Sequence, residues 1–230
     1  MTKKLPILII TLLFGLILTF NPKTVKADSP ELIQSSQTVS RIHQQSRSSS
    51  VKVSGINGGH GSGTYIQIGN RYGVITARHV AEGDSLFIIE NDGQAAVGRA
   101  VYLSSNHDIA LIETGRLRNT TPVKLGDIEA FDYEIGETVV YSGFPSSYDK
   151  LTSTGIISGY QRDHNAVICQ GFAWPGSSGS GVFTQGGNLV GVVYAVGVER
   201  YAVPEIIETL VYIAPLSDRE IRNMRRALED

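Results

Sequence analysis

The sequence is nearly devoid of cysteine, with Cys169 as the only one among 230 residues. A single cysteine cannot form an internal disulfide, so the fold must depend on its hydrophobic core. Cys169 stands in an apolar segment beside Ile168 and close to Phe172. A small buried side chain is expected there rather than a reactive thiol.

A strong charge of either sign is also lacking. Twenty Lys and Arg residues stand against 22 Asp and Glu residues, which gives a formal net charge of −2. No polyanion-binding face is expected, so nucleic acid is excluded as a partner. The spacing of the five histidines matches no zinc motif, and no metal or other cofactor is expected.

A long apolar run occurs at the N-terminus. The basic start Met1-Thr2-Lys3-Lys4 precedes LPILIITLLFGLILTF at residues 5–20. This run is shorter than the roughly 20 residues of a membrane span, and Val25-Lys26-Ala27 fits a signal-peptidase site. We expect a signal peptide over residues 1–27, a secreted or periplasmic protein, and no stable membrane association after cleavage. Without cleavage, the same segment would be a membrane anchor.

The residue pattern of the rest of the chain changes twice, at Val51 and at Ser217. Residues 28–50 are polar and rich in Ser and Gln, which predicts a spacer or a loosely attached N-terminal arm. From Val51, short apolar runs such as TYIQI (64–68) and YGVITA (72–77) alternate with turn residues, without helical periods between them. This pattern predicts an all-β barrel or sandwich.

The C-terminal segment, residues 217–230, has a helical pattern instead. Ser217 and Glu220 have the spacing of a capping box. The apolar residues that follow recur every three or four positions and predict one amphipathic helix on the barrel: Ile221, Met224, Ala227 and Leu228.

The segment WPGSSGSGVF, residues 174–183, admits two interpretations: a flexible linker, or a rigid loop that holds a reactive serine. Its flanks are AVICQGF (166–172) and the apolar stretch 181–196, which both predict buried strands. A loop between two core strands is rigid, so the second interpretation is favoured.

A serine nucleophile needs a base that takes its proton and a third group that orients the base. His79 follows an apolar strand in VITARHV (74–80), and Asp108 opens a buried strand in NHDIALIE (106–113). An acid at the start of a core strand is costly unless it is hydrogen-bonded. The order along the chain is therefore His79, Asp108, and then the serine-rich loop.

Three segments, TARHV, HDIALI and PGSSGSGV, resemble the signature segments of the trypsin/chymotrypsin-fold serine peptidases. The resemblance covers residues 51–216 and is greatest for the bacterial disulfide-free members: glutamyl endopeptidases, exfoliative toxins and high-temperature-requirement proteases. It implies two six-stranded antiparallel β-barrels, about residues 51–127 and 136–216, with the active site in the cleft between them.

The resemblance also implies roles for individual residues. Ser178 is the nucleophile, His79 is the general base, and Asp108 orients His79. The backbone N–H groups of Gly176 and Ser178 form the oxyanion hole, and an acyl-enzyme is the intermediate.

The sequence departs from the family around Ser178. Where the family often has an aspartate that pairs with a freed N-terminus, this chain has Ser177, so maturation at the N-terminus is not expected to switch the enzyme. Phe172 replaces the acid of basic-specific members. The expected substrate pocket holds no partner for a buried charge, which predicts cleavage after small or medium apolar residues; its residues are Phe172, Ala173, Val193 and Val196.

Tyr194 lies where relatives have a small hydroxyl residue that supports the buried aspartate. The partner of Asp108 is therefore open among the Tyr194 hydroxyl, the His79 backbone and the surroundings of Ser178. The remaining histidines are expected to be structural or solvent-facing: His43, His60, His107 and His164.

Three functions remain open for such a chain. The first is an active exported endopeptidase that acts on polypeptides. The second is a non-catalytic binding protein on the same barrels, and the third is a toxin-like protease with one narrow target. Nothing in the sequence indicates an oligomeric state.

Overall fold

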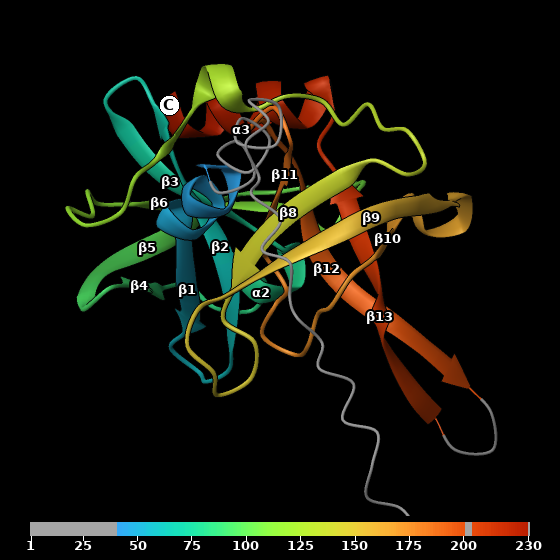
Figure 1. The fold of residues 1–230 in the computed structure, drawn as a ribbon. Helices are drawn as coiled ribbons and strands as arrows, with labels where there is room; N and C mark the ends of the chain where they lie inside the picture. The colour runs from blue at the N-terminus through green and yellow to red at the C-terminus, as the bar shows by residue number, and fades with distance from the viewer. Residues whose placement is uncertain (1–40, 201–203, 230) are drawn as a thin grey trace, which may run out of the picture.

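The computed structural model describes residues 41–200 and 204–229, and its strands form two closed barrels (Figure 1). The first barrel has the strand order β1-β4-β5-β6-β3-β2, and β2 pairs back onto β1 to close the ring. These strands are antiparallel; they are β1 (Ser50–Gly55), β2 (His60–Ile68), β3 (Arg71–Thr76), β4 (Phe87–Asn91), β5 (Gln94–Leu103) and β6 (Ala110–Thr114). A two-residue strand, β7 (Val123–Lys124), adds to β2 in parallel and was not expected from the sequence.

The second barrel has the closed order β10-β13-β12-β11-β8-β9. Its strands are also antiparallel; they are β8 (Thr138–Gly143), β9 (Leu151–Gln161), β10 (Ala166–Gln170), β11 (Gly181–Thr184), β12 (Leu189–Arg200) and β13 (Pro204–Pro215). Figure 1 shows β12 and β13 as a long hairpin that extends beyond the other strands. The expected fold of two six-stranded antiparallel barrels is confirmed.

Alternation along the strands explains why the barrels pack face to face. Tyr65 on β2 and Val74 on β3 belong to the core of the first barrel, whereas their neighbours Ile66 and Ile75 face the other way. Successive side chains of a strand point to opposite faces, so each strand serves two clusters. The outward cluster, which we call the seam, joins strands of both barrels: Ile66, Ile75, Ile109, Leu111, Val140, Phe183, Leu189 and Val192.

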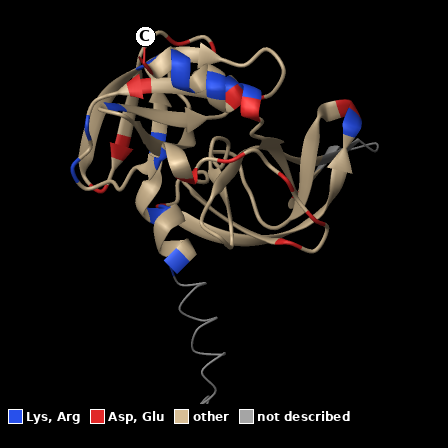
Figure 2. Cartoon of the chain, turned by 90° about the horizontal axis from the view of Figure 1, so that it is seen from above, with Lys and Arg blue, Asp and Glu red and all other residues tan. Residues whose placement is uncertain are grey.

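The C-terminal helix is confirmed as α3 (Asp218–Glu229), and Met224 and Leu228 bury their side chains against the seam. The Ser217 hydroxyl accepts a hydrogen bond from the Glu220 N–H at 3.2 Å, as a helix-capping serine does. Acidic and basic residues both occur on α3, and both are scattered over the rest of the described chain (Figure 2). Within the described residues, none of the helices has the length and apolarity to cross a membrane.

The expectation of a loose arm is wrong for its C-terminal part, because residues 41–49 form a docked helix. Ile42 is buried in the seam, and Ser46 donates a hydrogen bond to the Ser142 hydroxyl of the second barrel at 2.9 Å. The Ser50 hydroxyl donates to the Ser142 carbonyl, also at 2.9 Å. Serines that suggested a spacer in the sequence therefore form hydrogen bonds with the second barrel. The expected signal peptide and residues 28–40 lie outside the described residues.

Candidate active site

The serine-rich loop, residues 174–180, connects β10 to β11 and is fixed by its own backbone. The N–H of Ser177 donates to Trp174 at 2.8 Å, and that of Ser180 donates to Ser177 at 3.0 Å. Gly179 donates to the Val193 carbonyl of β12 at 2.7 Å and has a φ of 96°, a conformation that favours glycine. A side chain at Gly179 would place its Cβ 1.8 Å from the Ser62 carbonyl oxygen of β2. This loop is a rigid turn pressed against the first barrel, and not a linker.

His79 and Asp108 come together from separate parts of the first barrel. His79 lies on the short helix α2 (Arg78–Ala81) after β3, and Asp108 lies immediately before the core residue Ile109 that leads into β6. The His79 Nδ1 atom is 2.7 Å from Asp108 Oδ2, and the His79 backbone N–H donates to Asp108 Oδ1 at 3.0 Å. Burial raises the pKa of the Asp108 carboxyl, but the hydrogen bonds from His79 outweigh it and leave this pKa below its ordinary value. Asp108 is thus an ionised acceptor at neutral pH.

The His79 backbone is therefore a partner of Asp108, which is one of the three alternatives that the sequence left open. The Tyr194 side chain lines the same cavity as Asp108 and packs edge-on against Tyr212, with ring centroids 6.3 Å apart. Burial first, and then the nearby charge of Asp108, raise the pKa of Tyr194 to about 12. Among the hydrogen bonds of the described residues, none joins the Tyr194 hydroxyl to Asp108.

Ser178 shares a cavity of about 370 Å³ with His79, His60 and Gly176. Its hydroxyl donates to the Tyr194 carbonyl at 3.3 Å, and no hydrogen bond between Ser178 and His79 occurs within the described part of the chain. The hydroxyl reaches a new acceptor by rotation about one side-chain bond, and such contacts are often long in structures without substrate. The two groups, 99 positions apart in the sequence, thus face one cavity.

Two backbone N–H groups in this loop have no acceptor among the described residues: those of Gly176 and Ser178. The Pro175 carbonyl accepts a hydrogen bond from the Ser146 N–H at 2.6 Å, and in a trans peptide the next N–H points the opposite way. Gly176 has a φ of 97° and lines the cavity beside Ser178. The two N–H groups are free to donate to an oxygen bound there.

Ser177, the residue before Ser178, is held locally. Its hydroxyl accepts a hydrogen bond from the Trp174 N–H at 3.1 Å. This residue is buried, and its partner belongs to the same loop. The conformation of the loop is therefore fixed without an ion pair at this position.

The four expected pocket residues lie in two environments. Ala173 and Val193 are buried in the core of the second barrel, and Val196 packs against the same cluster. Phe172 is 45% exposed and stacks on Trp174 at a centroid distance of 6.2 Å. The Tyr141 hydroxyl, which sequence reasoning missed, donates to the Phe172 carbonyl at 2.8 Å and accepts from the Phe172 N–H at 2.9 Å.

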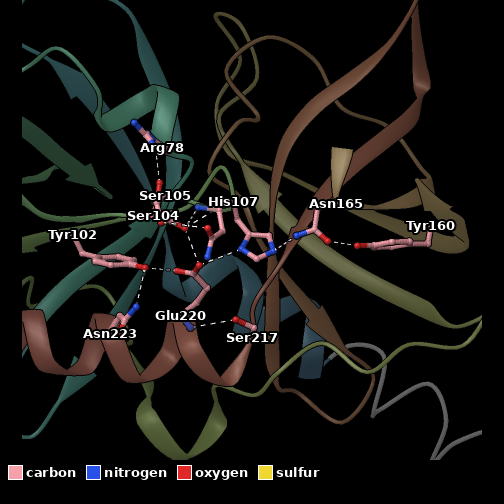
Figure 3. A network of polar contacts seen from close by, with 11 residues as sticks. Arg78, Tyr102, Ser104, Ser105, His107, Tyr160, Asn165, Ser217, Glu220 and Asn223 are labelled. Atoms are coloured by element: carbon pink, nitrogen blue, oxygen red, sulfur yellow. Dashed lines mark hydrogen bonds and ion pairs between the residues drawn. The ribbon is translucent and has the colours of Figure 1, made fainter. Parts of the chain in front are cut away.

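His107 joins a polar network around Glu220 of α3 (Figure 3), and it also lines a cavity with His79 and Asp108. The buried Glu220 carboxylate lies 3.1 Å from His107 Nδ1 and accepts hydrogen bonds from Ser104 at 2.7 Å and Tyr102 at 2.6 Å. Burial raises the pKa of Glu220, but hydrogen bonds from His107, Tyr102 and Ser104 outweigh it and lower this pKa overall.

This network holds the segment that carries Asp108. The Ser104 hydroxyl accepts from the N–H groups of Asn106 and His107, both at 3.1 Å. The Ser104 carbonyl accepts from Arg78, the neighbour of His79, at 2.6 Å. Sequence reasoning assigned Glu220 only to a capping box, and a buried acid at that position has no sequence signal of its own.

His60 was expected to be structural or solvent-facing, but it lies near Ser178. It lines the cavity of Ser178 and His79, and its Nε2 lies 3.0 Å from the Phe144 carbonyl oxygen. Sequence reasoning also missed Ser62, whose signal was the GSG pattern at residues 61–63. Among the described residues, no group of three or more His, Cys, Asp and Glu side chains could hold a metal ion.

Comparison with known proteins identifies the family. The profile of the trypsin-like peptidase domain matches residues 61–192, more than half of the chain. The periplasmic serine endoprotease DegP of Salmonella typhimurium is 28% identical over 144 residues, which cover 59% of this chain but 30% of that protein. The aligned part of this chain thus covers under a third of that relative.

Solved structures agree on the fold. The serine endoprotease from Yersinia pestis superposes with a TM-score of 0.65 at 19% identity, over 83% of this chain and 66% of that one. The HtrA-type protease AlgW, solved with a tripeptide, gives a TM-score of 0.66 at 17% identity, over 83% of this chain and 63% of that one. Of the three bacterial groups that the motifs resemble, these relatives belong to the high-temperature-requirement group. The chain is a member of the trypsin-like peptidase family.

Proposed function

We propose that this protein is a serine endopeptidase that hydrolyses polypeptides through an acyl-enzyme intermediate. The observation that carries the proposal is the cavity shared by Ser178, His79 and Gly176. Asp108 is hydrogen-bonded to the Nδ1 atom of His79. Nucleophile, base, orienting acid and two free N–H donors are the parts that this reaction requires.

The chemistry follows from which atoms are free. Asp108 accepts the Nδ1 proton of His79, which leaves Nε2 as the base. As the Ser178 oxygen attacks the carbonyl carbon, Nε2 takes the hydroxyl proton and later returns it to the leaving amine. Water then repeats the sequence on the acyl-enzyme, with His79 again as the base. For the first step, the Ser178 hydroxyl must give up its 3.3 Å contact with the Tyr194 carbonyl.

The oxyanion of each tetrahedral intermediate would accept hydrogen bonds from the N–H groups of Gly176 and Ser178. Both groups lack a protein acceptor among the described residues, so no internal bond has to break. One such donor contributes about 3–4 kcal/mol of transition-state stabilisation.

The substrate side chain before the cut bond is proposed to be small or medium-sized and apolar. The support is that Ala173, Val193 and Val196 belong to or pack on an apolar core and offer no partner for a carboxylate or a guanidinium. A cleavage profile from a peptide library tests this directly. Dominance of Glu, Lys or Arg before the cut would overturn it.

Export is part of the proposal. The apolar run at residues 5–20 and the Ala27 site support a cleaved signal peptide, and the DegP relatives carry periplasmic names. N-terminal sequencing of the protein recovered outside the cytoplasm should begin at Asp28. Retention of residues 1–27 would indicate an anchored protein instead.

The decisive experiment is covalent labelling with a fluorophosphonate, which reacts with activated serines. The purified protein should label, and Ser178→Ala should not. Ser180→Ala is the matched control, because Ser180 is a buried neighbour whose hydroxyl has no hydrogen-bond partner among the described residues. Label on Ser178→Ala, or none on the wild type, would reject the proposal. Casein digestion then separates a broad protease from one with a narrow target.

A further inference from the structure

Ser62 lies on β2 of the first barrel, is completely buried, and faces the second barrel. Its N–H donates to the Ser178 carbonyl at 2.7 Å, and its hydroxyl donates to the Gly176 carbonyl at 2.7 Å. The same hydroxyl accepts from the Phe144 N–H at 2.8 Å. One residue of the first barrel therefore bonds both residues whose N–H groups face the cavity.

These bonds constrain the peptide planes of the 174–180 loop. The two bonds from Ser62 hold the plane after Gly176 and the plane after Ser178. The bond from Ser146 to the Pro175 carbonyl holds the plane that carries the Gly176 N–H. The plane that carries the Ser178 N–H lies between two planes held by Ser62, so its orientation is also restricted.

Ser62 is itself fixed from several sides. Its carbonyl accepts from the Thr76 hydroxyl at 2.6 Å, and Thr76 is buried at the end of β3. Phe144, which donates to the Ser62 hydroxyl, is tied through its own carbonyl to His60 at 3.0 Å. A buried hydroxyl whose donor and acceptor capacities are both used has one rotamer available, which makes it a rigid support.

We propose that Ser62 is a positioning residue for the oxyanion hole, a role that rests on the proposed peptidase function. Its hydroxyl keeps the Gly176 carbonyl turned towards the first barrel, and so keeps the Gly176 and Ser178 N–H groups turned towards the cavity. The neutral Ser177 bonds within its own loop, and the hydrogen bonds from Ser62 support this loop from the first barrel.

A positioning role predicts an effect on the chemical step rather than on binding. In Ser62→Ala, the Gly176 carbonyl loses its donor and the Phe144 N–H loses its acceptor, while the base and the pocket keep their contacts. We expect the maximal rate of inactivation by a fluorophosphonate to fall about tenfold, because one of the two lost hydrogen bonds, that to the Gly176 carbonyl, orients the oxyanion hole. The reagent concentration that gives half this rate should stay within about twofold.

The matched control is Ser50→Ala. Ser50 is also a buried serine of the first barrel, and its hydroxyl also donates to a carbonyl of the second barrel, that of Ser142, at 2.9 Å. It bonds no residue of the 174–180 loop. Ser50→Ala should inactivate at the wild-type maximal rate, even where its melting temperature falls as much as that of Ser62→Ala.

The outcomes separate the two proposals. If the wild type does not label, the peptidase function itself fails. If the wild type labels and Ser62→Ala reacts at the same maximal rate, or loses no more than Ser50→Ala, the positioning role alone is rejected. A fall in rate that is confined to Ser62→Ala, at unchanged half-saturation, supports it.

Discussion

The buried carboxylate of Glu220 offers a test of the structure that does not depend on catalysis. It is 1% exposed and accepts hydrogen bonds from Tyr102, Ser104 and His107, with which it ties α3 to the first barrel. The Ser104 hydroxyl already accepts from two backbone N–H groups, so it must donate to Glu220 and cannot reverse.

Replacement by alanine leaves these donors buried without an acceptor. Removal of one partner from a buried network of this kind costs about 3–5 kcal/mol of unfolding free energy. For a chain of this size, each kcal/mol lowers the melting temperature by about 2–4 °C. We expect Glu220→Ala to melt roughly 10 °C below the wild type.

Glutamine should be tolerated better. Its amide oxygen can accept from Ser104 and His107, while its NH₂ group donates to the Tyr102 oxygen. The cost is then the loss of the charge, about 1–2 kcal/mol. Glu229→Ala is the control on the same helix, because the exposed pair of Glu229 with Arg225 at 3.0 Å contributes at most about 0.5 kcal/mol.

The pH dependence follows from the lowered pKa of Glu220. A carboxyl with a lower pKa in the folded state stabilises the fold above its unfolded pKa, about 4.3, and this contribution is lost as the pH falls through the folded value. The difference in unfolding free energy between the wild type and Glu220→Gln should be largest near pH 7 and should shrink below about pH 4.

Chemical denaturation at several pH values measures both effects. The reasoning is refuted if Glu220→Ala unfolds within about 0.5 kcal/mol of Glu229→Ala at pH 7. The difference in unfolding free energy between the wild type and Glu220→Gln should not increase towards low pH. Such an increase would show that the hydrogen bonds do not hold the Glu220 carboxyl ionised.

Three further predictions concern the site and the core. Asp108→Asn should lower kcat/KM about 10⁴-fold without loss of folding, since the amide cannot hold His79 in the required tautomer; a fall of under tenfold in a peptidase assay would contradict this. Gly176→Ala should lower kcat about 10²–10³-fold, since its φ is 97° and the new Cβ would lie 2.5 Å from the Phe144 carbonyl oxygen; wild-type inactivation kinetics would contradict it. Burial raises the pKa of Cys169 to about 12, so iodoacetamide at pH 8 should modify this thiol only in denaturant, and rapid alkylation of native protein would contradict its burial.

The sequence patterns predicted the barrels because they repeat a local signal many times. Alternation such as TYIQI followed by a Gly69-Asn70 turn is set by the strand itself, and it matches the hairpin of β2 and β3. The residues of the proposed triad were likewise predicted from three short segments, and the structure brings His79 to Asp108 and into the cavity of Ser178.

What the sequence did not reveal depends on contacts between distant segments. The helix over residues 41–49 is polar in composition, yet Ser46 finds its partner 96 positions away on Ser142. Ser62 reaches Gly176 across 114 positions, and Glu220 reaches Ser104 across 116. No local pattern encodes these pairings, because they exist only after segments that are distant in the sequence have packed together.

The division of the site between the barrels has a thermal consequence. His79 and Asp108 are carried by the first barrel and Ser178 by the loop before β11 of the second barrel, so the proposed reaction depends on how the two barrels are placed relative to one another. A displacement of about 1 Å between reacting groups can cost about 100-fold in rate. On heating, turnover should therefore decline while circular dichroism still reports intact β-structure, because a small shift between the barrels would leave each barrel folded.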